Sequence, residues 1–395
     1  MISPERPPLD IFRAMVSADC ALEQQLGAIA EMREFVAVAA AAADARGLLL
    51  DPATLERAAS PDPLGIDRFL PKPITGEAAP GPAWLPMAVV DLPDGPAVDW
   101  FYLGNRTLSE PFFEDSIRRG RSLPISRLMQ HRTPLAALPE AFGAEGVVPD
   151  GLIFHLSRCG STLVAQMLAA LPDTVVASEP PPFDHVLQRV AQANDQPIAQ
   201  RIALIRAMAA ALGRQTTPGG SFVIKTDCWH TNALPLLAAA FPETPWIFLY
   251  RDPVDIMVSQ VRQRGFQTIP GGIGASVFGI SSDGLSPEEY CAYLLERTCA
   301  PVIEASDRSR GLLINYAQLP DALEHSILPH FGIALDAPGR EALAAAALRD
   351  AKAPYQSFTP DTEEKRREAS PAVRAAVERY VAVPYQRLEM LRTGG

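Results

Sequence analysis

The segment Phe154–Leu163, FHLSRCGSTL, combines residue types and spacing suited to binding a phosphate or a sulfate. An apolar run, Gly151–Leu156, leads into it, and Leu163–Leu171 has helical composition, so the sequence predicts a strand, a turn and a helix. A turn of this kind directs backbone N–H groups toward an anion. Gly160 permits close approach of the backbone and Arg158 adds a permanent positive charge, so we expect an anion site here.

The turn differs from the usual nucleotide-triphosphate loop, which has a Lys followed by Ser or Thr directly after its last Gly. The lysines are Lys72, Lys225, Lys352 and Lys365, and only Lys225 precedes a Thr, with Ile224 before it. A basic residue two positions before Gly-Ser-Thr, at the end of a strand, instead resembles the phosphosulfate loop of sulfotransferases, which use 3′-phosphoadenosine 5′-phosphosulfate (PAPS). The resemblance implies that PAPS is held by Ser157, Arg158, Cys159, Gly160, Ser161, Thr162 and Leu163.

The segment Ser221–Gln260 carries a second pattern of that family. It is predicted to run strand, turn, helix, strand, turn and helix, with Phe222–Ile224 and Trp246–Tyr250 as buried parallel strands. Arg251 follows the second strand, and Ser259 lies eight residues further on. This arrangement resembles the 3′-phosphate site of sulfotransferases, which implies that both side chains hold the 3′-phosphate of PAPS.

The resemblance extends over Val148–Leu388. Gly311–Leu319 is similar to the last core strand of the family and its Tyr-containing turn, and Ala351–Pro371 is similar to the late loop with which bacterial members close over the cofactor. The candidate phosphate contacts in that loop are Lys352, Lys365, Arg366 and Arg367. We therefore expect an α/β fold with a mainly parallel sheet, helices on both faces, and the cofactor at the carboxyl ends of the strands.

Transfer of a sulfuryl group needs an in-line acceptor, stabilisation of the charge that grows on the leaving phosphate, and a base for the acceptor's proton. Arg158 and the loop N–H groups are expected to stabilise that charge. Many sulfotransferases carry the base as a His in a Lys-Thr-His turn, whereas this chain has Lys225, Thr226 and Asp227. An unshifted Asp, with a pKa near ~3.9, is a poor base unless burial raises its pKa.

Three residues remain candidates for the base. His230 lies three residues beyond Asp227 and has a better-matched pKa of about 6.5. Glu179, in the turn Ser178-Glu179-Pro180, is a candidate because other branches of the family use a Glu in the pocket. We rank Glu179 and His230 together, ahead of Asp227, and include Lys225 among the expected catalytic residues. The alternative for His230 is a helix-capping or surface role.

No metal is expected, because the sulfuryl group carries less charge than a phosphoryl group and the six His and five Cys lack C-x-x-C or H-E-x-x-H spacing. The isolated cysteines suit a reducing cytoplasm. Cys159 is expected to remain a thiol without a catalytic role, although the nearby Arg158 could lower its pKa. Leu163 stands where cytosolic members place an adenine-stacking Trp, which leaves Trp229 and Phe358 as candidate stacking residues.

The composition describes a chain of 395 residues, 48% hydrophobic, with a net charge of −11. It can bury a large core, and its charge argues against a nucleic-acid partner. We interpret the one basic cluster outside the late loop as a solvated helix face in preference to an anionic-substrate surface. The N-terminus lacks the apolar core of a signal peptide, and no apolar run is long enough to span a membrane, so we expect a cytoplasmic protein. The basic cluster comprises Arg118, Arg119, Arg121, Arg127 and Arg132.

The composition also divides the chain into parts. Residues 1–59 show apolar positions at helical spacing, and we expect a small helical module with Asp19 as an N-cap. Residues 9–59 weakly resemble the Nif11-like domain, which implies a peptide or protein partner; the alternative is a plain helical hairpin packed on the enzyme. Residues 60–86 are expected to form a Pro- and Gly-rich linker, residues 87–147 a hairpin and helices, and residues 148–395 the sulfotransferase-like domain.

The function expected from these patterns is transfer of a sulfuryl group from PAPS to a hydroxyl or amine, which releases 3′,5′-ADP. The acceptor is a small molecule or a peptide, including a natural-product intermediate. One alternative is a P-loop kinase-like enzyme that uses ATP, which the missing Gly-Lys-Ser/Thr pattern disfavours. The other is a catalytically silent nucleotide-binding or interaction protein, which the missing Lys-Thr-His turn favours.

Overall fold

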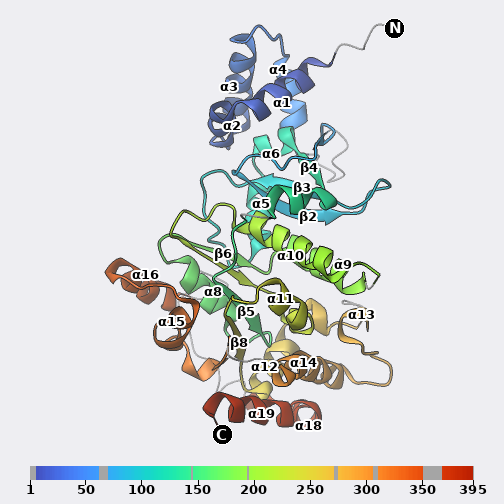
Figure 1. The fold of residues 1–395 in the computed structure, drawn as a ribbon, viewed down its shortest axis with the longest axis vertical. Helices are drawn as coiled ribbons and strands as arrows, with labels where there is room; N and C mark the ends of the chain where they lie inside the picture. The colour runs from blue at the N-terminus through green and yellow to red at the C-terminus, as the bar shows by residue number, and fades with distance from the viewer. Residues whose placement is uncertain are drawn as a thin grey trace.

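The computed structural model describes residues 6–61, 70–143, 146–193, 195–270, 275–305, 310–349 and 367–394. Figure 1 shows the N-terminal helices at one end of the molecule, a small sheet next to them, and a larger sheet with its helices toward the C-terminal end. None of the helices in the described ranges is long and apolar enough to cross a membrane.

The larger sheet is parallel throughout and, in the described residues, has five strands in the order β6-β7-β5-β8-β9. Every residue of β5 and β8 is buried, as expected for central strands covered on both faces. The predicted α/β fold with a parallel sheet is confirmed. The strands are β5 (Gly151–His155), β6 (Thr174–Ser178), β7 (Ser221–Lys225), β8 (Trp246–Tyr250) and β9 (Gly311–Asn315).

Helices cover both faces of this sheet, because successive strand residues point to opposite sides. In β5, Leu152 and Phe154 pack into the core formed with α9, α10 and α14, whereas Ile153 packs with α8 and α16. The helices of this part are α8 (Ser161–Ala169), α9 (Pro181–Gln192), α10 (Ile198–Gly213), α11 (Leu234–Ala240), α12 (Pro253–Arg262), α13 (Ala275–Phe278), α14 (Pro287–Glu304), α15 (Leu328–Phe331), α16 (Ala337–Ala347), α18 (Pro371–Tyr380) and α19 (Ala382–Thr393). Shorter turns are η2 (Cys228–Ala233), η3 (Phe266–Thr268), η4 (Tyr316–Gln318) and η5 (Leu323–Ile327).

The smaller sheet has the order β1-β4-β3-β2, and α9 and α10 lie between it and the larger sheet (Figure 1). Its strands β2 and β3 are antiparallel and form the hairpin expected around Asp94 and Gly95. Two short stretches, β1 and the first residues of β2, fall inside the segment 60–86. The elements are β1 (Ile74–Thr75), β2 (Trp84–Val90), β3 (Ala97–Tyr102), β4 (His131–Pro134), α5 (Phe113–Arg121), α6 (Pro124–Met129), η1 (Leu135–Ala137) and α7 (Leu138–Phe142).

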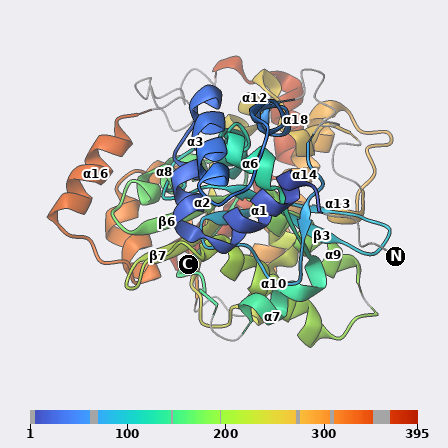
Figure 2. The ribbon, with the colours of Figure 1, turned by 90° about the horizontal axis from the view of Figure 1, so that it is seen from above.

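The N-terminal helices pack on α6. The view from above shows them in front of the rest of the molecule (Figure 2). The guanidinium of Arg13 is buried and donates to the carbonyls of Leu128 (2.8 Å) and Lys72 (2.7 Å). Trp84 of β2 donates its indole N–H to Glu23 over 2.8 Å. The helices are α1 (Pro8–Ala18), α2 (Cys20–Gly27), capped by Asp19 as expected, α3 (Met32–Asp44) and α4 (Pro52–Ala59).

We predict that Arg13→Leu lowers the free energy of unfolding by about 2–3 kcal/mol, because the substitution leaves buried carbonyls without a donor. The matched control is Arg33→Leu, on the exposed side of α3, for which we expect a change within about 0.5 kcal/mol. Urea denaturation followed by circular dichroism measures both changes. Equal effects of the two substitutions would contradict an anchoring role for Arg13.

Candidate functional site

The loop between β5 and α8 has the conformation of an anion-binding turn. Ser157 (φ 56°), Arg158 (φ 49°) and Gly160 (φ 87°) all have left-handed backbone. A Cβ atom at Gly160 would lie 2.8 Å from the ring of Tyr316, so only glycine fits both the backbone and the space. Non-glycine residues in this region are strained, and such strain is concentrated at binding sites. The sequence prediction of strand, turn and helix is confirmed.

His155, the last residue of β5, holds this loop in place through hydrogen bonds. His155 was not identified from the sequence. Its Nδ1 accepts the N–H of Ser157 over 3.1 Å, and its Nε2 lies 3.0 Å from the carbonyl oxygen of Thr226 and 3.2 Å from a carboxylate oxygen of Glu179. Because Nδ1 accepts, the neutral ring carries its proton on Nε2. Burial, together with the charge of Lys225, lowers the pKa of His155 and favours this neutral form. The one signal in the sequence is a polar residue that ends an apolar strand.

Lys225 ends β7 and is completely buried. Its ammonium group pairs with the carboxylate of Glu179 and lies 5.4 Å from the centre of the Phe112 ring. Burial alone would raise the pKa of Glu179, but the charge of Lys225 and the hydrogen bond from His155 outweigh it and hold that pKa well below its usual range. A carboxylate with so low a pKa accepts protons poorly, so this geometry favours an ion-pairing role for Glu179.

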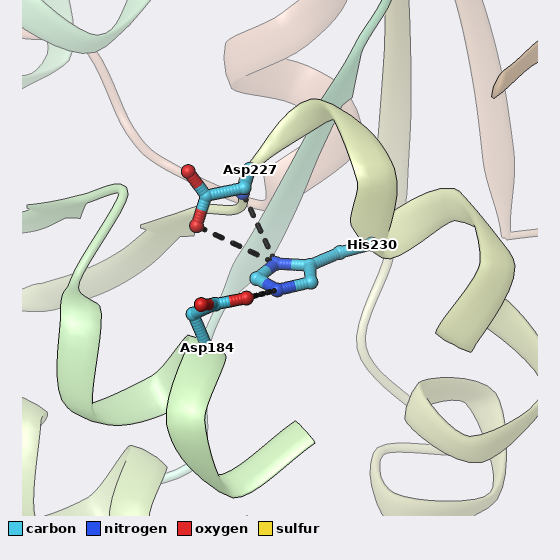
Figure 3. A group of neighbouring side chains, drawn as sticks. All are labelled: Asp184, Asp227 and His230. Carbon is cyan, nitrogen blue, oxygen red and sulfur yellow. Dashed lines mark hydrogen bonds and ion pairs between the residues drawn. The ribbon is translucent and has the colours of Figure 1, made fainter. Parts of the chain in front are cut away.

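His230 lies in a hydrogen-bonded group with Asp227 and Asp184, shown in Figure 3. Its Nδ1 accepts the backbone N–H of Asp227 over 3.1 Å, and its Nε2 lies 2.8 Å from Asp184 Oδ1. Asp227 and His230 form a capping box at the start of η2, so the lone pair of the ring is occupied. This is the helix-capping alternative considered from the sequence, and it leaves His230 without a free nitrogen to accept an acceptor's proton.

Asp184 collects several donors in this group. In addition to His230, it accepts N–H bonds from Trp229 (2.7 Å) and Gln188 (2.6 Å). Burial opposes the shift, but these hydrogen bonds lower the pKa of Asp184 to about 2. The ligand atoms of Asp184, Asp227 and His230 lie within 4.8 Å of one another, a spacing that a metal could use. Since both nitrogens of His230 and the oxygens of Asp184 already engage protein groups, the arrangement fits a hydrogen-bond network better than a metal centre.

The side chain of Asp227 follows Lys225 and Thr226 directly. Burial raises its pKa to about 7, and the negative charges of Glu179 and Asp184 add to this shift. A base with a pKa near the working pH is well matched to general-base catalysis. The sequence indicated that Asp227 could act as a base only if burial raised its pKa, and burial does raise it.

The remaining residues of the loop are held by local contacts. Arg158 donates to the carbonyl of Gln263, at the end of α12, over 2.7 Å, and burial lowers the pKa of its guanidinium. The thiol of Cys159 donates to the carbonyl of Leu249 over 3.1 Å, and burial raises its pKa to about 11, the direction opposite to the one that its nearness to Arg158 suggested. Within α8, Ser161 and Thr162 are buried and Leu163 packs against the core.

Arg251 follows β8 and is almost completely buried. Its Nε donates to Asp255 over 3.0 Å, and its guanidinium carbon lies 4.1 Å from the centre of the Tyr316 ring. Ser259 donates its hydroxyl to the backbone carbonyl of Asp255 over 2.9 Å. Tyr316 thus lies against both Arg251 and Gly160, and it links the two predicted phosphate sites.

The order of the strands brings these groups together. β5 lies between β7 and β8, so the loop, Lys225 and Arg251 emerge next to one another at the carboxyl edge of the sheet. This edge is where ligands bind in open α/β sheets. The candidate phosphate contacts Lys352, Lys365 and Arg366 and the stacking candidate Phe358 lie outside the described residues.

One family model matches the part of the chain that contains this site. Residues 152–272 match the family model described as "Sulfotransferase family", a span that contains the loop, Lys225, Asp227 and Arg251. No curated protein matches the chain. The match does not include residues 9–59, so the Nif11-like resemblance stays a prediction.

Several solved structures resemble the chain at low identity. A sulfotransferase from Mycobacterium avium is 13% identical, with 60% of this chain and 78% of that chain covered and a TM-score of 0.39. A sulfotransferase from Alicyclobacillus acidocaldarius is 15% identical, with 62% and 96% covered and a TM-score of 0.39. The sulfotransferase domain of the Synechococcus PCC 7002 olefin synthase is 18% identical, with 63% and 96% covered and a TM-score of 0.35.

We predict that His155→Phe destabilises the protein by about 1–3 kcal/mol, because the N–H of Ser157 loses its buried acceptor. His155→Asn, which keeps a donor and an acceptor, should recover part of that loss. Urea denaturation of both variants measures the difference. If Phe and Asn proved equally destabilising, the packing of the ring rather than its hydrogen bonds would determine the stability of the loop.

Proposed function

We propose that the chain is a PAPS-dependent sulfotransferase that transfers a sulfuryl group to a hydroxyl or amine of its acceptor and releases 3′,5′-ADP. The observation that carries the proposal is the shared sheet edge at which the left-handed loop is flanked by Lys225 on β7 and Arg251 on β8. The family match over residues 152–272 supports it.

The residues present at this edge fit PAPS. The N-terminus of α8 begins at the Gly160 turn, where backbone N–H groups and the positive end of the helix dipole favour an anion. We assign the 5′-phosphosulfate end to this loop with Arg158, and the 3′-phosphate to Arg251 and Ser259. Bound PAPS supplies a sulfuryl group on a phosphate leaving group. Arg158 and the N–H groups of the loop stabilise the negative charge that accumulates on that leaving group.

Asp227 is our candidate for the general base. Its carboxylate accepts the proton of the acceptor's hydroxyl or amine, and a pKa of about 7 leaves it substantially ionised at neutral pH. His230 fixes the Asp227 backbone through the capping box, and Glu179 neutralises Lys225. This assignment reverses the ranking made from the sequence, in which Glu179 and His230 preceded Asp227.

The acceptor approaches from the side of the segment between β3 and α5, which packs against the candidate site. The carbonyl of Ser109 accepts from Gln166 of α8 over 3.2 Å, and the carbonyl of Pro111 accepts from Ser178 of β6 over 2.9 Å. Phe112 then places its ring beside Lys225. These contacts support the segment as one wall of the acceptor site.

We predict that Asp227 titrates near pH 7, and that Asp227→Asn removes this titration while the side chain still caps η2. Infrared difference spectra of wild type against Asp227→Asn, taken across pH, should show a protonated carboxyl band that disappears through this range. Turnover of a phenolic acceptor with PAPS should rise with pH through the same range in the wild type. His230→Gln is the control, in which the titration should persist. If the titration disappeared in His230→Gln but persisted in Asp227→Asn, His230 would be the base.

The free energy of unfolding should also depend on pH through the protonation of Asp227. Because the pKa of Asp227 is raised above its ordinary value of 3.8, the protonated form favours folding, and that contribution is lost as the pH rises through about 7. We therefore expect the stability of Asp227→Asn relative to wild type to increase as the pH rises from the ordinary pKa of 3.8 to about 7. Urea midpoints measured from pH 4 to pH 8 test it, and a constant difference would contradict a raised pKa.

The donor assignment is tested by calorimetric titration with 3′,5′-ADP, 5′-AMP and magnesium-ATP. We predict tight, metal-independent binding of 3′,5′-ADP, and a selective loss in Arg251→Ala of about 1.5–3 kcal/mol that 5′-AMP does not show. Arg340→Ala, on exposed α16, is the control. Equal losses for both nucleotides would remove Arg251 from the 3′-phosphate site, and a preference for magnesium-ATP would make the chain a kinase-like enzyme.

A further inference from the structure

A pocket lies apart from the carboxyl edge of the large sheet, among the hairpin sheet, α5, α6 and residues 70–73. Its volume is about 810 Å³, large enough for a small organic molecule. The helix α5 connects it to the candidate transfer site: Phe112, just before α5, lies beside Lys225, whereas Arg118 and Arg121 of the same helix line the pocket. At 1.5 Å per residue, the two ends of α5 are separated by about 12 Å.

The lining of this pocket is positive in a chain whose net charge is −11. Among the described lining residues, Lys and Arg outnumber Asp and Glu by five to two. One of the two acids, Asp99, is held by Arg132 in a bidentate pair of 2.5 and 2.8 Å. The positive residues are Lys72, Arg118, Arg121, Arg127 and Arg132.

This pocket gathers most of the arginine cluster that the sequence shows. Four of its five members line this single pocket, and the fifth, Arg119, pairs with Glu110 over 2.9 Å elsewhere. Arg118 pairs with Asp115 over 3.0 Å, but its side chain is 74% exposed. Exposed pairs of this kind contribute little free energy, so the guanidinium can exchange Asp115 for an incoming anion at small cost.

The pocket also offers apolar surface. Met87 and Ile117 line it, and so do Trp100 and Phe101, which are almost completely buried beneath it.

We propose that this pocket binds a small organic anion with an apolar body. The acidic group of the ligand pairs with Arg118 and Arg121, and its body packs on Met87 and Ile117. The site goes beyond the proposed sulfuryl transfer, and its occupation does not require that function.

The probe for the test is 8-anilinonaphthalene-1-sulfonate, an aromatic sulfonate whose fluorescence rises on binding. The full-length protein is titrated as wild type, as the double variant Arg118→Ala/Arg121→Ala, and as the control Arg340→Ala/Arg379→Ala, whose arginines form exposed ion pairs elsewhere. We expect saturable binding at one site, weakened about tenfold or more in the first variant and unchanged in the control. Equal affinities in the two double variants would overturn the proposal.

Two competition experiments separate this site from the nucleotide site. Saturating 3′,5′-ADP should leave the affinity for the sulfonate unchanged, and displacement by 3′,5′-ADP would contradict a distinct pocket. Inorganic phosphate should displace the probe only weakly, because it supplies charge without an apolar body; efficient displacement would contradict the apolar component. A chain that fails to bind 3′,5′-ADP but passes the arginine test would lose the proposed transferase function and keep this site.

Discussion

The burial of Lys225 is the constraint on which the candidate site depends. A completely buried ammonium group is unstable unless a carboxylate compensates it, and Glu179 provides that charge. Glu179 in turn has left-handed backbone, a strained conformation that the surrounding contacts must hold in place. His155 contacts the same carboxylate and accepts from Ser157. One ion pair therefore ties the ends of β6 and β7 to the anion loop after β5.

Arg251, the second cation at the carboxyl edge of the sheet, is also paired with a buried carboxylate. Asp255 accepts from Arg251, and the Tyr316 ring covers its guanidinium. Internal carboxylates thus hold both cations in fixed positions, so their geometry is set before any anion arrives. Such preorganisation reduces the reorganisation needed when charge develops in a transition state. The cost is that two carboxylates lie next to the anion site, where they oppose anion binding.

The sequence was sufficient for the parts of the fold that depend on local patterns. Apolar runs predicted the buried strands, and the glycine between Arg158 and Ser161 predicted the turn, because its conformation excludes other residues. The same patterns could not rank the bases. The pKa of Asp227 depends on burial and on Asp184, which comes from α9 and is distant in sequence. The role of His155 could not be predicted from the sequence either, because its contacts are with Glu179 and Thr226, in turns that follow other strands.

The ion pair and the candidate base are coupled through their charges. Glu179 stays ionised because Lys225 is beside it, and its negative charge contributes to the raised pKa of Asp227. Lys225 acts on Asp227 in the opposite direction, since its own charge lowers that pKa. The pair as a whole is nearly neutral to a distant group, so burial remains the dominant cause of the shift. A substitution that removed one partner would leave the other charge uncompensated, and it would change both the support of the loop and the proton affinity of Asp227.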